Sequence, residues 1–578
     1  MILPATLAFG TVAYFSMEIG LQPEIPTYSG GLGVLAGDTL RSAADLGLPM
    51  VGVTLLHRRG YMRQHLDPQG NQTESPEVWN PEDVLELLPP RVSIVIEDRQ
   101  VQIRSWRYLV QGMNGHTVPV FFLDTALPDN SPYDQTITDN LYGGDQNYRL
   151  YQEVVLGIGG VALLRALGYQ DHLIYHMNEG HSALLTLSLL ESQAAAARGD
   201  FPTEDDFEAV RRHCVFTTHT PVPAGHDKFP WDMVRQVLGP TRTDLLEAAR
   251  CCMQGSLNMT YLALRFSRYI NGVAMRHGEI STGMFPGYPV NAITNGVHAT
   301  TWTAPALAAL YDRHIPEWRQ DNFYLRYAIG IPLSDIQVAH LEAKQALLTA
   351  VRERTGIALA AKNLTIGFAR RATAYKRQDL LFTDLERLRR LAQQVGPFQV
   401  IYGGKAHPQD DSGKEMIRRV FAAAQALADA VPVVYLENYD MGLGKLICAG
   451  VDLWLNTPLR PQEASGTSGM KAALNGVPSF SVLDGWWIEG HVEHVTGWSI
   501  GNSTYPPEDY THDAASLYEK LEQIILPLYY SRPERYAQVR RAAIALNGSF
   551  FNTQRMLSQY VMNAYAVQEQ AAGRSAAS

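Results

Sequence analysis

Short apolar runs alternate with helix-compatible runs through the second half of this chain. The apolar runs expected to form strands are 364–368, 398–402, 431–436, 451–455 and 480–483. Helices are expected between them, at 376–394, 414–430 and 443–449. Regular alternation of strands and helices is typical of a parallel, doubly wound sheet. The second half is therefore predicted to be an α/β domain of this class.

The first half also reads as an α/β domain, although its pattern is less regular. Residues 1–20 are apolar but lack a basic leader and contain Glu18, so they indicate a buried first strand and not a signal peptide. Further expected elements are strands at 92–97, 101–110, 118–123, 172–177 and 214–218, and helices at 148–167, 334–354 and within 514–570. With 578 residues the chain is long enough for two domains, predicted as 1–297 and 298–578.

Composition excludes several classes of protein. Hydrophobic residues make up 46% of the chain and charged residues 18%, as in packed globular cores. The formal net charge of −10 argues against nucleic-acid or anionic-membrane partners. The four cysteines have no CxxC spacing, which favours a reducing cytoplasm, and no apolar run is long enough to span a membrane. The sequence predicts a soluble, cytoplasmic protein.

Two motif-like patterns are interpreted as false positives. The spacing Gly31-x-Gly33-x-x-Ala36 imitates a dinucleotide fingerprint, but it does not follow its strand directly and no acid lies at the required distance. The histidines near His181 and His219 do not match the H-E-x-x-H pattern, and no cysteines supplement them. No nicotinamide cofactor and no metal are expected.

The segment 463–490, EASGTSGMKAALNGVPSFSVLDGWWIEG, carries the strongest chemical signal. A loop of small residues leads into a short helix that ends near Asn475-Gly476, and a strand follows. The N–H groups at such a helix start suit an anion or a hydroxyl-rich ligand. Lys471 in the first turn opposes the helix dipole, so its position calls for a functional reason.

A second cationic segment, 370–378 (RRATAYKRQ), follows the expected strand 364–368. Ligands of open α/β sheets bind where strands end, so these cations are placed to hold an anion. A solvated basic surface is the plainer alternative. Arg371 and Lys376 would supply most of the binding free energy, because charge-assisted hydrogen bonds are stronger than a helix terminus.

Together these segments resemble the α-glucan phosphorylases of glycogen, starch and maltodextrin, in their short bacterial form. The resemblance extends from Tyr14 to about Trp487 and is weaker in the tail. It implies two doubly wound, Rossmann-like domains facing a central cleft, the glycosyltransferase-B architecture. At 370 and 372–374 the chain departs from the commoner family pattern, which affects the detail of the pocket and not the expected phosphate role.

The resemblance assigns the site residue by residue. Pyridoxal 5'-phosphate is expected as a Schiff base on Lys471, with further cofactor contacts from Gly31, Thr467, Trp302 and Tyr439. The expected catalytic residues are Lys471, Arg371, Lys376 and His219. The substrate pocket is expected to contain Gly30, Gly31, Leu32, His181, His219, Asn295, Tyr375, Glu463, Ser465 and Gly466.

The implied reaction moves a glucosyl unit from the non-reducing end of an α-1,4-glucan to inorganic phosphate. The product is α-glucose 1-phosphate with retained configuration, and the cofactor's 5'-phosphate acts as the proton relay. Glycogen and maltodextrin both fit as the glucan, and the resemblance leaves room for a homodimer. Because the first glycine loop lies near residue 30, we expect no regulation by AMP.

Two rival functions remain to be separated. A nucleotide-sugar glucan synthase could share the two-domain fold, but it has no use for a lysine at position 471. A non-catalytic glucan-binding relative has no need of Lys471, Arg371 and Lys376 together. Bound pyridoxal phosphate distinguishes the phosphorylase from both.

Overall fold

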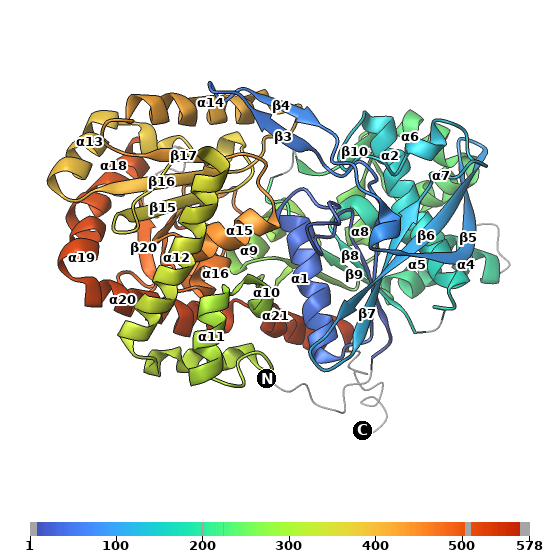
Figure 1. The fold of residues 1–578 in the computed structure, drawn as a ribbon. Helices are drawn as coiled ribbons and strands as arrows, with labels where there is room; N and C mark the ends of the chain where they lie inside the picture. Colours follow the sequence, from blue (N-terminus) through green and yellow to red (C-terminus); the bar gives the residue numbers. More distant parts are fainter. Residues whose placement is uncertain (1–8, 171, 198–201, 223–224, 503–509, 567–578) are drawn as a thin grey trace.

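The protein consists of two α/β lobes that lie side by side (Figure 1). The computed structural model describes residues 9–170, 172–197, 202–222, 225–502 and 510–566. Each lobe is built around a sheet of mainly parallel strands covered by helices, which confirms the predicted fold class.

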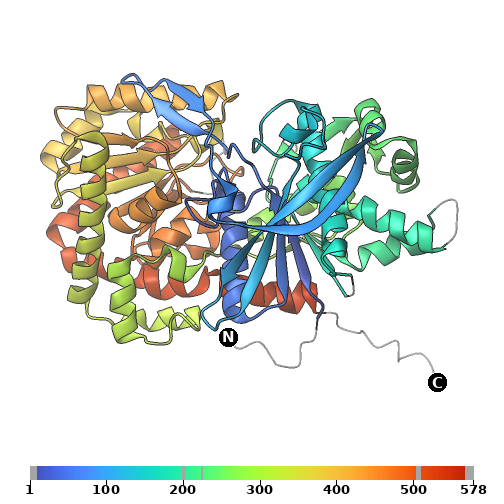
Figure 2. The ribbon, with the colours of Figure 1, turned by 45° about the vertical axis from the view of Figure 1, so that its right-hand side comes forward.

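The first lobe contains a nine-stranded sheet in the order β14-β13-β9-β8-β1-β2-β7-β6-β5. Its strands are β1 (Val12–Phe15), β2 (Met50–Leu55), β5 (Glu86–Ile96), β6 (Arg99–Gln111), β7 (Thr117–Asp124), β8 (Ile174–Asn178), β9 (Cys214–Thr217), β13 (Tyr269–Gly272) and β14 (Asn291–Ala292). Strands β14 to β7 run parallel, and β6 and β5 extend the sheet as an antiparallel ribbon (Figure 2). From β1 the chain adds strands toward one edge of the sheet, and from β8 it adds them toward the other edge. The parallel pair β1 and β8 is therefore the topological switch point.

The second lobe contains a six-stranded, all-parallel sheet in the order β17-β16-β15-β18-β19-β20. Its strands are β15 (Leu364–Ala369), β16 (Phe398–Gly403), β17 (Val433–Leu436), β18 (Leu453–Asn456), β19 (Ser479–Val482) and β20 (Gly497–Ile500). The five strands predicted in this half are present, because continuous apolar runs suit a sheet that is buried on both faces. The sixth, β20, was not predicted. Here the switch point lies between β15 and β18.

Helices cover both sheets. Those before residue 290 are α1 (Gly31–Leu46), α2 (Gln146–Val154), α3 (Gly160–Ala166), α4 (Leu185–Ala197), α5 (Glu204–Arg211), α6 (Trp231–Leu238), α7 (Pro240–Ala248), α8 (Met259–Arg265) and α9 (Met275–Met284). Those that follow are α10 (Ala299–Trp302), α11 (Pro305–His314), α12 (Leu333–Thr355), α13 (Leu385–Gln394), α14 (Asp411–Ala426), α15 (Met441–Gly450), α16 (Ser468–Leu474), α17 (Trp487–Gly490), α18 (Tyr510–Lys520), α19 (Leu526–Ser531), α20 (Pro533–Ala542) and α21 (Thr553–Tyr560).

One predicted helix, 376–394, is wrong in its first half. After β15 the chain forms a short 3₁₀ turn, Ala374–Lys376, and a regular helix begins only with α13 at Leu385. Arg377 adopts a left-handed conformation with φ of 45°, and its buried guanidinium bonds the Thr457 and Pro458 carbonyls and Asp513. These contacts with distant residues override the local helix propensity of the segment.

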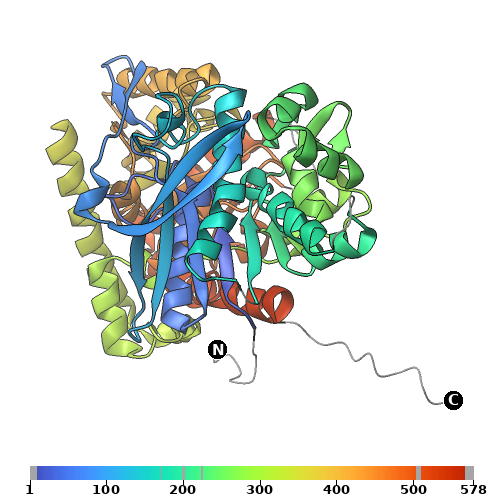
Figure 3. The ribbon, with the colours of Figure 1, turned by 90° about the vertical axis from the view of Figure 1, so that its right-hand side faces the viewer.

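The last helix returns to the first lobe, where it lies below the strands (Figures 2 and 3). Residues of α21, including Met556, Leu557 and Tyr560, share a buried core with Val12 and Tyr14 of β1. The domain limits 1–297 and 298–578 stay a prediction, with this helix as a segment of the second half that packs on the first lobe.

The two chain crossings between the lobes lie against each other. The Val297 N–H donates to Phe551 O at 3.2 Å, and the Thr553 N–H donates to Val297 O at 3.0 Å. Next to this contact, a Cβ on Gly296 would come within 2.2 Å of the Asn552 carbonyl carbon. Only glycine allows the two crossings to approach this closely.

Gly296→Ala is therefore expected to lower the free energy of unfolding by about 1–3 kcal/mol, because backbone atoms must move apart. Gly283→Ala is the control, since a Cβ on that exposed helical glycine would meet no heavy atom within 4 Å and alanine is the better helix former. Denaturant unfolding of both variants tests this. Equal stabilities would show that the crossings can separate without cost.

A hairpin of the first lobe also reaches the second lobe. It is formed by β3 (Arg63–Leu66) and β4 (Gln72–Ser75) and lies beside α14 (Figure 1). Gln64 Nε2 donates to Gly404 O at 3.0 Å, and Gln72 Nε2 donates to Ala406 O at 2.9 Å. Both glutamine side chains are buried, so the hairpin is fixed to the far lobe by satisfied polar contacts.

Candidate functional site

The predicted site residues gather where the switch points of the two sheets face each other. In the second lobe, β15 is followed by Arg370 and Arg371, and β18 is followed by the loop that leads to Glu463. In the first lobe, β1 is followed by Glu18 and the glycine loop, and β8 is followed by the segment that contains His181. Parallel sheets place ligand-binding groups at these strand ends.

Two cations from the segment after β15 converge on Glu463. Lys376 Nζ lies 2.6 Å from Glu463 Oε2, and the Arg370 guanidinium bonds the same oxygen. All three side chains are buried. Burial tends to raise the pKa of the Glu463 carboxyl, but Arg370 and Lys376 outweigh it and lower that pKa to about 2. Burial, reinforced by Arg370, lowers the pKa of Lys376 to about 7.

Arg371 lies between the two lobes. Part of the residue is exposed to solvent, although many protein atoms lie around its guanidinium group. A Cβ on Gly30 would lie 3.1 Å from Arg371 Cδ, so the arginine stem runs directly over the glycine loop of the other lobe. Burial lowers its pKa, but Tyr375 and Glu18 oppose this and the net shift is upward. Arg371 is thus a permanent cation next to the start of α1.

The glycine loop forms the N-terminus of α1. Gly30 is the N-cap and has no side chain with which to cap the helix. Gly31 is exposed and Leu32 is half-buried in the first turn, where backbone N–H groups have no helical acceptor. These groups can face an anion held by Arg371.

Lys471 is buried in α16, with its amine against an aromatic ring. Its Nζ lies 3.6 Å from the ring centroid of Trp302 in α10. The Trp302 indole donates to Asp38 Oδ2 at 2.7 Å, which fixes the ring. Burial lowers the pKa of Lys471, and a lowered pKa favours the neutral, nucleophilic amine. The remaining predicted cofactor contacts are Thr467, the N-cap of α16, and Tyr439, whose hydroxyl lies close to Gly444.

Specific contacts fix the conformation of the loop after β18. Glu463 N donates to Asp484 Oδ2 at 2.9 Å, and Gly485 lies so close that its Cβ would come within 2.4 Å of Ser465 O. Gly466 has φ of 86°, a conformation that glycine adopts without strain. Ser465 Oγ is buried and has no hydrogen-bond partner in the described part of the chain.

The two predicted site histidines of the first lobe, His181 and His219, are neutral. Burial lowers the pKa of His219 to about 3 and that of His181 to about 4. His219 is oriented by Asn178 Oδ1, 2.6 Å from its Nε2, and its backbone N–H donates to Glu179 Oε2 at 2.8 Å. His181 Nε2 lies 3.4 Å from Asp227 Oδ2. Both can take part in neutral hydrogen bonds to a sugar.

Asn295 and Tyr375 are two further predicted substrate residues. The buried Asn295 Oδ1 has no hydrogen-bond partner among the described residues, which suits a ligand hydroxyl. Tyr375 carries its ring 4.4 Å from Lys376 Nζ. The structure thus brings the second-lobe residues Arg371, Tyr375, Lys376 and Glu463 into one neighbourhood, with the glycine loop above Arg371.

Three residues of the site were missed by sequence reasoning. Glu18 accepts hydrogen bonds from Ser29 N and from Gly30 N, and Tyr142 Oη donates to it at 3.1 Å. Asp38 fixes Trp302, as described above. For Glu18, the available signal was an acid immediately after a strand at a switch point. Arg370, which stood out in the sequence only as a departure from the family pattern, is a partner of Glu463.

The residues present fit pyridoxal phosphate. Lys471 supplies a buried amine, and Arg370 Nη1 is a buried donor that has no hydrogen-bond partner within the described ranges. Across those same ranges, no group of three or more His, Cys, Asp or Glu is arranged for a metal ion. A search of the described helices also finds none long and apolar enough to cross a membrane.

Comparison with known proteins finds relatives along nearly the whole chain. A family described as carbohydrate phosphorylase matches residues 241–497. The maltodextrin phosphorylase of Thermococcus litoralis is 39% identical over 96% of this chain and 70% of its own length. The glycogen phosphorylase of Mycobacterium tuberculosis is 36% identical (98% and 72%), and that of Aquifex aeolicus is 34% identical (96% and 86%).

Proposed function

The chain belongs to the carbohydrate phosphorylase family, and from this premise we propose that it is an α-1,4-glucan phosphorylase. It transfers a glucosyl unit from the non-reducing end of the glucan to inorganic phosphate and releases α-glucose 1-phosphate. The observation that carries the proposal is the meeting of the β15 cations with Glu463, in the segment that also carries Lys471. The relatives named for glycogen and maltodextrin support the substrate class.

Arg371 and Lys376 would hold the reacting phosphate. Arg371 offers a planar, always charged fork over the glycine loop, where the N–H groups of Gly31 and Leu32 have no helical acceptor. Lys376 offers a buried ammonium. Arg371 beside the helix N–H groups, together with Lys376, would neutralise the charge that an anion brings into a partly desolvated cleft.

The sugar would be held by groups whose hydrogen bonds are incomplete in this structure. Ser465 Oγ and Asn295 Oδ1 have no hydrogen-bond partner in the described part of the protein. Glu463, which here accepts from Lys376, could accept from a sugar hydroxyl in its place. Tyr375, Gly466 and the neutral His181 and His219 complete the proposed pocket. The His219 backbone is oriented by Glu179, so its carbonyl can lie near the anomeric carbon.

Lys471 would bind pyridoxal phosphate through its amine, with Gly31, Thr467, Trp302 and Tyr439 as further contacts. The cofactor's 5'-phosphate would supply an acid–base group for a transfer with retained configuration. The protein's part would be to provide cations for the bound phosphates. Arg370, whose Nη1 has no partner among the described residues, is a further cation for this purpose.

An assay for glucose 1-phosphate tests the proposal. Purified protein supplied with pyridoxal phosphate, maltodextrin and inorganic phosphate is expected to release glucose 1-phosphate, and omission of phosphate should stop the reaction. Transfer of glucose from a nucleotide sugar in place of phosphorolysis would identify a glucan synthase. Glucan binding without either reaction would identify a non-catalytic relative.

The pH dependence of phosphate use provides a second test. Because the pKa of Lys376 is about 7, its charge is lost as the pH rises through that value in the free enzyme. We expect kcat/KM for phosphate to fall above about pH 7, and this fall to move to higher pH in Lys376→Arg, where the side chain stays charged. Ionisation of phosphate affects both enzymes equally. Coincident profiles would show that Lys376 does not titrate in this range.

A further inference from the structure

A second pocket lies at the opposite ends of the strands that carry the phosphate-binding residues. It has a volume of about 310 Å³ and lies between α12, α19 and α20. Lys362, just before β15, and Asp452, just before β18, contribute to its lining. The candidate active site lies at the carboxyl ends of the same two strands. The pocket is therefore separate from that site.

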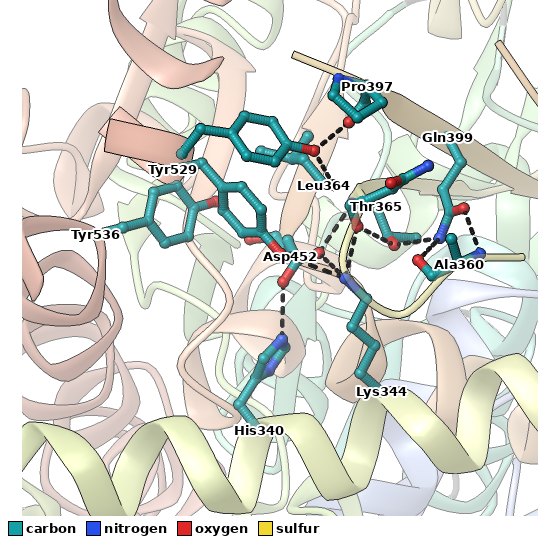
Figure 4. Close-up of polar contacts among 12 residues, drawn as sticks. His340, Lys344, Ala360, Leu364, Thr365, Pro397, Gln399, Asp452, Tyr529 and Tyr536 are labelled. Carbon is teal, nitrogen blue, oxygen red and sulfur yellow. Dashed lines mark hydrogen bonds and ion pairs between the residues drawn. The ribbon is translucent and has the colours of Figure 1, made fainter. Parts of the chain in front are cut away.

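Asp452 is the centre of the polar contacts in this pocket (Figure 4). Its carboxylate accepts hydrogen bonds from Lys344 Nζ, from the Arg540 guanidinium and from His340 Nε2 at 3.0 Å. The Thr365 N–H adds a fourth contact at 2.8 Å. Burial tends to raise the pKa of this carboxyl, but Lys344, His340 and Arg540 lower it overall, so Asp452 stays ionised.

The charge of the pocket is unbalanced. Its described lining residues include three cations, Lys344, Lys362 and Arg540, against the single carboxylate of Asp452. His340 adds no charge, since burial and Arg540 lower its pKa to about 4. The two buried cations, Lys344 and Arg540, share the one carboxylate of Asp452, which leaves an excess of buried positive charge that an anion can balance. Lys362, in contrast, is exposed to solvent. The protein is otherwise acidic, with a formal net charge of −10.

The walls indicate more than a simple inorganic ion. Tyr529, Tyr530 and Tyr536 line the pocket, with the rings of Tyr529 and Tyr530 5.0 Å apart and those of Tyr529 and Tyr536 5.2 Å apart. Such aromatic walls provide apolar surface for the organic part of a ligand, and the volume exceeds that of a single phosphate. Lys362 is exposed at the pocket and can contact an incoming anion directly.

We propose that this pocket binds a small organic anion, a phosphate ester with a compact organic group. The phosphate contacts Lys362 in the field of Lys344 and Arg540, and the organic group packs on Tyr529 and Tyr530. Inorganic phosphate shares the anionic part of this chemistry and is compared with the ester in the test.

The pocket is also connected to the candidate active site. Arg540 Nη1 donates to Gly476 O at 3.3 Å, directly after the helix that carries Lys471. From Asp452, strand β18 leads to Thr457, whose hydroxyl donates to Lys376 O at 2.9 Å. A ligand that draws on Arg540 or Asp452 therefore acts on segments that hold both Lys471 and Lys376.

Calorimetric titration of the 578-residue chain with phenyl phosphate tests the binding site. Saturable binding is expected, about tenfold or more weaker in Lys362→Glu and unchanged within about twofold in Arg354→Glu. Arg354 is an exposed cation on α12 outside the pocket lining, so its reversal changes the net charge equally. Arg371→Ala should also bind normally. Absence of binding, equal binding in Lys362→Glu, or loss in Arg371→Ala would overturn the proposal.

Two further measurements refine the ligand and its effect. In Arg371→Ala, inorganic phosphate is expected to bind the pocket more weakly than phenyl phosphate; equal affinity would contradict the proposed role of the organic group. Phenyl phosphate should also change the phosphorolysis rate of the wild type more than that of Lys362→Glu, an arm that rests on the proposed function. Identical responses, with pocket binding intact, would contradict the connection to the active site and leave the enzyme assignment unaffected.

Discussion

Lys471→Ala is expected to fold normally, to bind no pyridoxal phosphate and to have no measurable phosphorylase activity. The lysine lies in α16 with its amine over the ring of Trp302. Burial lowers its pKa, which favours the neutral amine that attacks a carbonyl. Borohydride reduction of the wild type should leave a stable adduct on the peptide that contains Lys471. Absorbance of the cofactor, peptide mapping and glucose 1-phosphate release are the measurements.

Lys445→Ala is the matched control for this variant. Lys445 is an exposed lysine on the neighbouring helix α15, and its removal should leave cofactor content and activity unchanged. Lys471→Arg keeps a positive charge but cannot form the covalent link, so it should be as inactive as Lys471→Ala. An adduct on another lysine, or full activity of either Lys471 variant, would falsify the assignment.

Arg371→Ala is expected to lose about 2–4 kcal/mol of transition-state stabilisation, measured as the fall in kcat/KM for phosphate. Lys376→Ala is expected to lose a similar amount. Each removes a charge-assisted contact from a partly desolvated site. The two variants should differ toward the glucan. Arg371 stands over the glycine loop, whereas Lys376 bonds Glu463, a proposed sugar ligand. Lys376→Ala should therefore also change the glucan KM, and Arg371→Ala much less.

Steady-state kinetics with phosphate and glucan varied independently provide the measurement. Arg371→Lys should recover only part of the loss, because an ammonium cannot reproduce the bidentate fork. Arg419→Ala is a control, since Arg419 is an exposed arginine of α14 that pairs with Asp379 and Glu415. Unchanged phosphate dependence in both Arg371→Ala and Lys376→Ala would show that this segment is only a basic surface.

Much of the fold could be predicted because both sheets bury continuous apolar strands. The runs that became β15, β16 and β18 are apolar on both faces and are bounded by helices, so a local pattern is sufficient to identify them. The segment 376–384 could not be predicted in the same way. Its conformation depends on Arg377, which is buried against Thr457 and Asp513 far along the chain.

The candidate site shows the same division. Lys471 and the cations after β15 lie in distinctive sequence motifs, so they could be identified from the sequence. The structure places Lys376 next to Glu463. Glu18 and Asp38 act through tertiary contacts with Gly30 and Trp302, and a single acid carries no local pattern that would reveal such a role. The convergence of Arg370 and Lys376 on one carboxylate depends on a pairing across 87 residues for Lys376.

The paired crossings at Val297 and Asn552 have a mechanical consequence. Two covalent connections that lie side by side and are hydrogen-bonded to each other define a short axis between the lobes. A single flexible connection would allow the lobes to rotate relative to each other in any direction. This pair of connections resists twisting and favours a hinge motion about one axis. The hydrogen bonds that Gln64 and Gln72 donate to the far lobe oppose this motion. If the lobes move apart, these same few hydrogen bonds have to break and re-form, so their separation carries a free-energy cost.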